Sequence, residues 1–154
     1  RVSEVEIDLA LLFEEILPDT IATPLDWAIP EQESIAGETG YGELLTALEE
    51  WNGTHVLPGL KGHDKFQARV AGNALGIARR QAEWEAGYRE AAQARLAAIG
   101  YDHRQLCLGL SKGEIAATSP GVWDHLRLSA LERLSIDQPK YAGLKVALNK
   151  WSPS

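Results

Sequence analysis

The stretch HDKFQARVAGNALGIARR, from His63 to Arg80, decides the fold class. It predicts a helix that has apolar or small residues around most of its circumference and only a narrow polar side. At about 100° per residue, mainly apolar residues gather on one side of this helix, and leucine and alanine gather on the opposite side. The first side holds Phe66, Val70, Asn73, Ile77 and Trp84, and the second holds Ala68, Ala71, Leu75 and Ala78. A helix that is apolar or small nearly all round is a central one, so we expect residues 64–87 to form the central helix of the domain.

Two glycines, Gly72 and Gly76, lie four residues apart in the remaining arc of this helix. Each costs about 1 kcal/mol relative to alanine in a helix interior, so the close approach of another group must offset that cost. One interpretation is a neighbouring helix that crosses at both glycines, with Arg69 paired to a carboxylate. The other is a shallow groove that is floored by the glycines, rimmed by Lys65, Arg69 and Arg80, and open to an anionic partner group.

Asn73 lies within the apolar stripe, where an unpaired amide is costly. We therefore expect a loop backbone to dock against this amide, and the turn IDQPKY at 136–141 is the candidate. Asp137 of the same turn would pair with Arg69. The sequence thus predicts a structural clamp that is made of Arg69, Asn73, Asp137 and Tyr141.

Helical periodicity continues on both sides of the opening stretch, and no segment of useful length alternates with a period of two. Residues 3–17 predict an amphipathic first helix, and the proline-containing residues 18–40 predict a long connector that Trp27 and Ile29 pin to the body. Further helices are expected at 41–52, 88–99, 102–113 and 119–138, the last of which ends at Pro139. The prediction is an all-α bundle of five or six helices, with residues 1–40 as N-terminal helix and linker and residues 41–150 as the bundle domain.

Composition narrows the function classes. The 154 residues carry a formal charge of −7, which disfavours a surface devoted to nucleic acid. The single cysteine, Cys107, excludes an intramolecular disulfide and favours a reducing compartment. The sequence contains no run of 18 apolar residues, so it predicts no membrane span. We expect a cytoplasmic protein, and because the chain begins with Arg1 instead of Met, we expect it to be trimmed or to begin inside a longer polypeptide.

The residues that could carry chemistry do not form a recognisable constellation. None of the four histidines has a second ligand at metal-site spacing, and Cys107 on a leucine-rich helix is expected to be a buried, inert thiol. The turn before His63 leads into a helix N-terminus that could hold a phosphate, but it lacks the Walker spacing. We therefore expect no catalytic residues, no metal and no cofactor, and we favour a protein that is not an enzyme on its own. Candidate anion-binding residues are Lys61, His63, Arg69 and Arg80.

Four segments between Tyr41 and Lys145 resemble a bacterial family of small helical domains of unassigned function. They are YGELLTALEEW, VLPGLKG, FQARVAGNALGIARRQ and HLRLSALERLSIDQPKYAGLK. The strongest signatures are the RVAxNAL helix at 69–75 and the IDxPxYxGL ending at 136–144. Genes of this family lie beside, or are fused to, aminoglycoside-phosphotransferase-like kinases and acyl-CoA dehydrogenases.

The resemblance implies a non-catalytic accessory subunit of an ATP-dependent hydroxyacyl-CoA kinase in hydroxy-acid catabolism. Its implied partners are the kinase and, beyond it, an acyl-CoA dehydrogenase or acyl-CoA. The resemblance assigns no catalytic role to Arg69, Asn73 or Asp137. An alternative is a helical module that binds acyl-CoA or a phosphate ligand and acts with an acyl-CoA dehydrogenase. Residues 1–40 fall outside the resemblance and would suit either the tail of a fused kinase or an extension that binds the partner.

Overall fold

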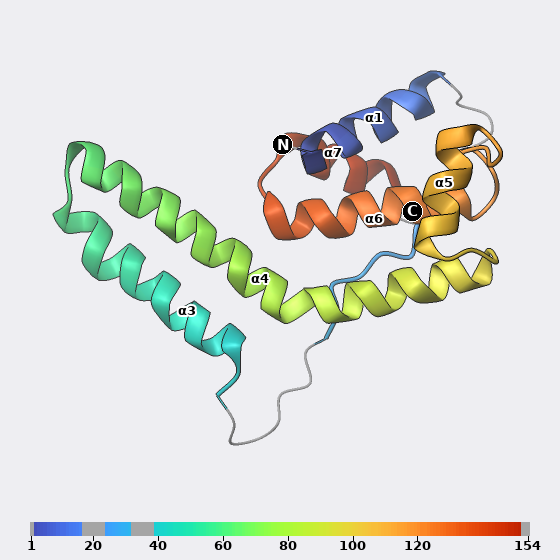
Figure 1. The fold of residues 1–154 in the computed structure, drawn as a ribbon. Helices are drawn as coiled ribbons and strands as arrows, with labels where there is room; N and C mark the ends of the chain where they lie inside the picture. The colour runs from blue at the N-terminus through green and yellow to red at the C-terminus, as the bar shows by residue number, and fades with distance from the viewer. Residues whose placement is uncertain (1, 17–23, 32–38, 152–154) are drawn as a thin grey trace. The chain divides into compact units, whose positions relative to one another are not determined.

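The computed structural model describes residues 2–16, 24–31 and 39–151, and within these ranges it is helical and contains no strand (Figure 1). The all-α prediction is therefore confirmed. The helices are α1 (Val2–Ile16), α3 (Tyr41–Trp51), α4 (Gly62–Ala98), α5 (His103–Lys112), α6 (Val122–Asp137) and α7 (Ala142–Trp151). A π-helical turn at Asn52–Val56 and a 3-10 turn at Leu57–Gly59 follow α3.

The chain divides into two compact units, and helix α4 contributes residues to both. The first unit comprises Arg1–Ile29 and Tyr88–Ser154, and the second comprises Pro30–Gly87. Helix α1, which was predicted to lie apart with the linker, packs against α6 and α7 within the first unit (Figure 1). The predicted boundary near Gly40, as a boundary between folding domains, stays a prediction.

The main core of the first unit lies among α1, α6 and α7. Helix α6 supplies its centre, with Leu131 and Leu134 at most 1% exposed, and Ile7 of α1 is fully buried against it. Burying each such side chain stabilises the fold by roughly 1.5–3 kcal/mol. The chain before α3 joins this core through Leu25, whose backbone N–H donates to the carbonyl of Trp151 at 2.8 Å. Trp27 packs on the core as predicted, whereas Ile29 is exposed.

Helix α5 begins and ends where the sequence predicts. The Asp102 carboxylate accepts from the backbone N–H of Gln105, and the Gln105 side chain accepts from the backbone N–H of Asp102, which completes a capping box. Gly113 ends the helix in the left-handed conformation at φ 71°, which glycine adopts without a Cβ clash. Leu106 packs with Leu96 and Val122 in a second small core, so that α5 is held against the end of α4 and the start of α6.

Helix α4 is one continuous helix of 37 residues, whereas the sequence predicted two helices that divide after Gly87. Glycine weakens a helix interior by only about 1 kcal/mol, and it does not break the hydrogen-bond ladder as proline does. Gly87 allows Pro30 to approach the helix backbone closely, because a Cβ at position 87 would lie 2.5 Å from Cβ of Pro30.

Two further differences from the predicted helices lie near the C-terminal end. Helix α6 starts at Val122 instead of near Ser119, because Ser119 and Pro120 form a turn and Gly121, at φ 77°, precedes the helix. Helix α7 follows the turn after Pro139 and was not predicted. Its signal was the helical spacing of Leu144, Ala147 and Trp151, which are all buried.

The second unit contains a pair of helices, α3 and the first part of α4, that meet at the two predicted glycines. Asn52, directly after α3, donates from Nδ2 to the carbonyl of Ala68 at 2.9 Å, and a Cβ at Gly72 would lie 2.8 Å from that nitrogen. At Gly76 a Cβ would lie 3.1 Å from the Glu49 carboxylate. A neighbouring segment therefore approaches both glycines closely, as the first interpretation expects, but the arginine of that interpretation, Arg69, is exposed.

Candidate functional site

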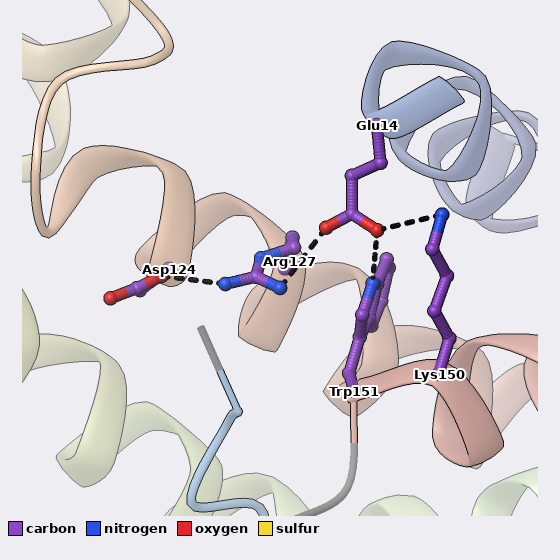
Figure 2. A network of polar contacts seen from close by, with 5 residues as sticks. All are labelled: Glu14, Asp124, Arg127, Lys150 and Trp151. Atoms are coloured by element: carbon purple, nitrogen blue, oxygen red, sulfur yellow. Dashed lines mark hydrogen bonds and ion pairs between the residues drawn. The ribbon is translucent and has the colours of Figure 1, made fainter. Parts of the chain in front are cut away.

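A buried polar network joins α1 to α6 and α7 in the first unit (Figure 2). Arg127 of α6 is fully buried and donates from Nη1 to Oε1 of Glu14 at 3.0 Å and from Nη2 to Oδ1 of Asp124 at 2.7 Å. The other oxygen of Glu14 accepts from Nε1 of Trp151 at 2.6 Å and lies 3.1 Å from Nζ of Lys150. The Arg127 guanidinium also lies over the Trp151 ring, 5.4 Å from its centroid.

This network fixes α1 and is not an open catalytic centre. A buried arginine keeps its charge, so it needs carboxylates and hydrogen bonds to compensate for the loss of water. Glu14 and Asp124 provide them, and Trp151 adds a cation–π contact. The sequence analysis missed Arg127. The only local signal was Asp124 three residues earlier on the same helix face, because Glu14 is 113 residues away along the chain.

A second polar cluster joins the end of α4 to α6. Arg95 donates one hydrogen bond from each of its terminal nitrogens to the two carboxylate oxygens of Glu132, each at 2.8 Å. His125 is buried, and this burial, together with the nearby charges of Arg95 and His103, lowers its pKa from 6.5 to about 4. A neutral, buried imidazole of this kind does not reach a substrate in solvent. We therefore assign the cluster to the packing of α6.

The predicted anion-binding residues all lie in the second unit, on α4 or directly before it. Lys61, His63 and Arg69 are exposed, whereas Arg80 is half-buried. The His63 ring accepts a hydrogen bond from the Gln67 amide at 2.8 Å. Their role as ligand-binding residues stays a prediction.

The side chains that approach the glycines occupy the place of the predicted groove, because Asn52 lies at Gly72 and Glu49 and Arg80 lie at Gly76. The arginine that is paired with carboxylates near the glycines is Arg79, whereas the sequence analysis expected Arg69. Arg79 donates from Nε to Glu49 at 3.0 Å and from Nη1 to Glu83 at 2.9 Å. Arg79 therefore occupies the ion-paired position that the sequence analysis gave to Arg69, which is exposed.

The predicted clamp would join residues of the two units and stays a prediction. Arg69 and Asn73 lie on the part of α4 in the second unit, and both are exposed. Asp137 is the last residue of α6. Tyr141 precedes α7, and its hydroxyl donates to Oδ2 of Asp8 at 2.7 Å.

Cys107 differs from its prediction because it is exposed instead of buried. It lies on the outer side of α5, and its Sγ is 3.7 Å from Nε2 of His103, one turn earlier. The leucines around it in the sequence suggested an apolar environment, but only Leu106 and Leu110 turn inward, one turn apart, and Leu108 is exposed. Within the described ranges, no group of three or more histidine, cysteine or acidic side chains is placed to hold a metal ion.

The most distinctive surface feature of the second unit is a set of exposed apolar side chains. The stripe that was predicted to face a core is instead open along its first half, since Phe66 and Val70 of α4 are 62% and 50% exposed. Helix α3 packs through Gly42 and Glu49, which leaves larger residues outside. The exposed ones are Tyr41, Leu44, Leu48 and Trp51, each at least 49% exposed. At helical spacing the four residues of α3 fall on one side of that helix, and Phe66 and Val70 lie one turn apart on α4. Exposed apolar rows of this kind are typical of surfaces that bind another molecule.

Comparisons with known proteins agree with the resemblance at the level of the domain. A family model described as a domain of unknown function, DUF6285, matches residues 58–141, more than half of the chain. The match begins in the turn before α4 and ends just before α7. No curated protein and no solved structure matches the chain. The chain therefore belongs to the DUF6285 family of domains of unknown function.

Proposed function

We propose that this protein is a non-catalytic subunit that supports an ATP-dependent kinase of hydroxyacyl-CoA. The kinase, of the aminoglycoside-phosphotransferase type, would transfer the γ-phosphate of ATP to the hydroxyl group of the acyl chain and release ADP. The present chain would hold the kinase in its active form or hold its acyl-CoA substrate. Such a role places the protein in the cytoplasm, where ATP and acyl-CoA are available. Among the described residues, no helix is long and apolar enough to cross a membrane.

The observation that carries this proposal is the exposed apolar surface of the second unit. Phe66 and Val70 belong to the DUF6285 match and lie on the helix that carries the RVAxNAL signature. Large apolar side chains in water cost roughly 25 cal/mol for each Å² that a partner would cover. Protein interfaces are enriched in aromatic side chains, and Tyr41, Trp51 and Phe66 provide three of them. A subunit that acts by contact explains this surface better than an enzyme does.

The test is reconstitution of kinase activity from purified components. The aminoglycoside-phosphotransferase-like kinase of the source organism is assayed with ATP and a hydroxyacyl-CoA, with and without this chain. We expect at least a tenfold increase in the rate of phosphorylated acyl-CoA formation when the chain is present. Equal rates, together with the absence of a complex between the two proteins, would overturn the proposal.

A pair of variants on α4 connects the activity to the surface. Val70→Lys introduces a charge within the apolar stripe and should reduce the stimulation of the kinase at least tenfold. Ala71→Lys introduces the same charge at the next position, which is exposed but lies about 100° around the helix. This control should stimulate the kinase like the unmodified chain.

A second candidate function is direct binding of CoA, and the exposure of Lys61, His63 and Arg69 favours it. Basic side chains near the start of a helix attract phosphate groups, and the helix N-terminus adds unsatisfied N–H donors. In that case the chain would present acyl-CoA to an acyl-CoA dehydrogenase. Isothermal titration of the chain with CoA tests this function, since a subunit that acts only by holding the kinase in its active form binds no CoA.

A further inference from the structure

Helix α1 is packed with its apolar side outward. The side that faces α6 and α7 consists of a serine, an isoleucine, an alanine and a glutamate, each at most 8% exposed: Ser3, Ile7, Ala10 and Glu14. The opposite side consists of large apolar residues, each between 46% and 71% exposed: Val2, Val5, Leu9, Leu12, Phe13 and Ile16. Phe13 lies at one edge of this side, and its ring also packs edge-on against the ring of Trp123 of α6, with the centroids 6.0 Å apart. An amphipathic helix that is packed on its own core normally has the reverse arrangement.

The orientation of α1 about its own axis is set by Glu14. Its carboxylate is held by Arg127, Trp151 and Lys150 at distances of 2.6–3.1 Å (Figure 2). Turning the helix to bury its apolar side would withdraw this carboxylate from the buried Arg127. Removing one partner of a buried ion pair is strongly destabilising, because the remaining charge stays buried without compensation. The outer face of α1, defined as the six residues from Val2 to Ile16 given above, is therefore held toward solvent.

The size of the outer face fits a docking surface. Six large side chains, each about half exposed or more, present on the order of 500 Å² of apolar area, in the upper part of the range for the largest patch on a typical monomer. They recur at the spacing of a helix that lies in a groove, with anchors one turn apart. Their regular placement along 15 residues distinguishes this face from scattered apolar residues on a surface.

Charges along the borders of the face specify the partner. Asp8 and Glu15 are both exposed, fall within about 20° of each other and form an acidic border along one side of the face. On the other side the charge is compensated, since Glu6 accepts from Nη1 of Arg133 at 2.8 Å. A second copy packed antiparallel would bring one acidic border against another, and the net charge of −7 adds to the repulsion.

We propose that the outer face of α1 docks into an apolar groove of a second protein, and that lysine or arginine side chains line one edge of that groove. This inference rests on the proposed function, because the kinase is the partner that we expect to carry the groove. It adds a second contact with the kinase to the apolar surface of the second unit. The network around Glu14 then serves to present the face, while the acidic border sets the direction in which α1 enters the groove.

The test is the affinity of the purified kinase for variants of the full chain, measured by isothermal titration. Leu9→Lys introduces a charge at the centre of the face and should weaken binding at least tenfold. Val146→Lys makes the same kind of change at an equally exposed residue of α7, 54% against 48%, and should leave the affinity unchanged. Circular dichroism shows whether both variants keep the fold. Equal affinity of the two variants for the kinase would overturn the inference.

The acidic border has a separate test in salt. Glu15→Lys should weaken kinase binding several-fold at low ionic strength, and the difference should disappear at high ionic strength because salt screens exposed charges. If Glu15→Lys binds as well as the unmodified chain at low salt, the basic edge of the groove is excluded.

Failure of this inference and failure of the proposed function give different results. If the kinase is bound and stimulated equally by the unmodified chain and Leu9→Lys, the function stands and the outer face of α1 is not the contact. If the kinase does not bind the unmodified chain, the proposed function fails, and a photo-crosslinking amino acid at position 9 then tests the face in cells. A cross-link to an apolar segment beside lysine or arginine in another protein, with binding of that purified protein weakened by Leu9→Lys, supports the inference. A cross-link between two copies, a cross-link within one chain or the absence of any cross-link overturns it.

Discussion

Glu14 of α1 and Arg127 of α6 form an ion pair of 3.0 Å in which the two side chains are 4% and 0% exposed. These residues are 113 positions apart, so the pair is a tertiary link between the first helix and the helix at the centre of the core. It also determines which side of α1 faces water. The stability of the first unit and the presentation of its apolar outer face therefore depend on the same contact.

Glu14→Ala should destabilise the protein by about 3 kcal/mol or more, because Arg127 stays buried and loses one of its carboxylates. Chemical denaturation with urea measures the change. Arg133→Ala is the control, since its pair with Glu6 is largely exposed, and it should cost at most about 1 kcal/mol. Equal losses in both variants would mean that the buried pair adds nothing beyond a surface pair.

Gly72→Ala should destabilise the second unit even though alanine favours helices by about 1 kcal/mol over glycine. The new Cβ would lie 2.8 Å from Nδ2 of Asn52, which must then move away from the Ala68 carbonyl. Leaving this buried amide unsatisfied costs about 1–3 kcal/mol. Thermal unfolding measures the difference.

Gly53→Ala is the matched control for this substitution, because a Cβ there meets no atom within 4 Å and the residue has no left-handed φ. Its melting temperature should be unchanged or higher. In an Asn52→Ala background, Gly72→Ala should cause no further loss. A further loss of full size would show that the Asn52 amide is not what the glycine accommodates.

Stability should fall as the pH decreases from 6.5 toward 4, and His125 should account for part of this fall. Its pKa is 6.5 in an unfolded chain and about 4 in the folded protein. Between these values the unfolded state binds the proton and the folded state does not, so acid favours unfolding. The full contribution is about 3 kcal/mol, present above pH 6.5 and lost as the pH falls through 4.

The free energy of unfolding, measured against pH for the unmodified chain and for His125→Gln, checks this contribution. The variant should have a flatter profile in this window, whereas His55→Gln, which changes an exposed histidine, should keep the original slope. Identical slopes for all three proteins would exclude a proton-linked role for His125.

If the second candidate function holds, Arg69→Ala should weaken CoA binding about tenfold, because an exposed arginine near the start of α4 contributes a charge-assisted hydrogen bond to phosphate. Isothermal titration measures the affinity. Arg89→Ala removes an equally exposed arginine from the same helix and should leave the affinity unchanged. Absence of CoA binding at millimolar concentration would remove this function.

The sequence predicted those parts of the fold that depend on local chemistry. Asp102 and Gly113 mark the two ends of α5, because a carboxylate cap and a left-handed glycine each act within one turn of the helix. Gly72 and Gly76 indicated a close neighbour, which left a helix crossing and a groove as the two interpretations. The neighbours themselves, Asn52 and Glu49, lie 20 and 27 positions earlier in the chain, so the sequence did not identify them.

The remaining features depend on contacts that are distant in the sequence. Gly87 lies inside α4, and the residue that packs against it, Pro30, is 57 positions earlier in the chain. The burial of Arg127 depends on Glu14, and the exposure of Phe66 and Val70 depends on what α3 covers and what it leaves open. Periodicity identified the apolar stripes of α1 and α4, but it does not say whether a stripe faces the core of its own chain or another molecule.

The most direct measurement of the central claim is the mass of the species formed when the purified kinase and this chain are mixed. It is obtained by size-exclusion chromatography with light scattering at physiological salt. The account predicts a stable complex with the kinase that carries both chains, and its loss in Leu9→Lys and Val70→Lys but not in Val146→Lys and Ala71→Lys. Separate elution of the kinase and the unmodified chain, each at its own mass, would contradict the account.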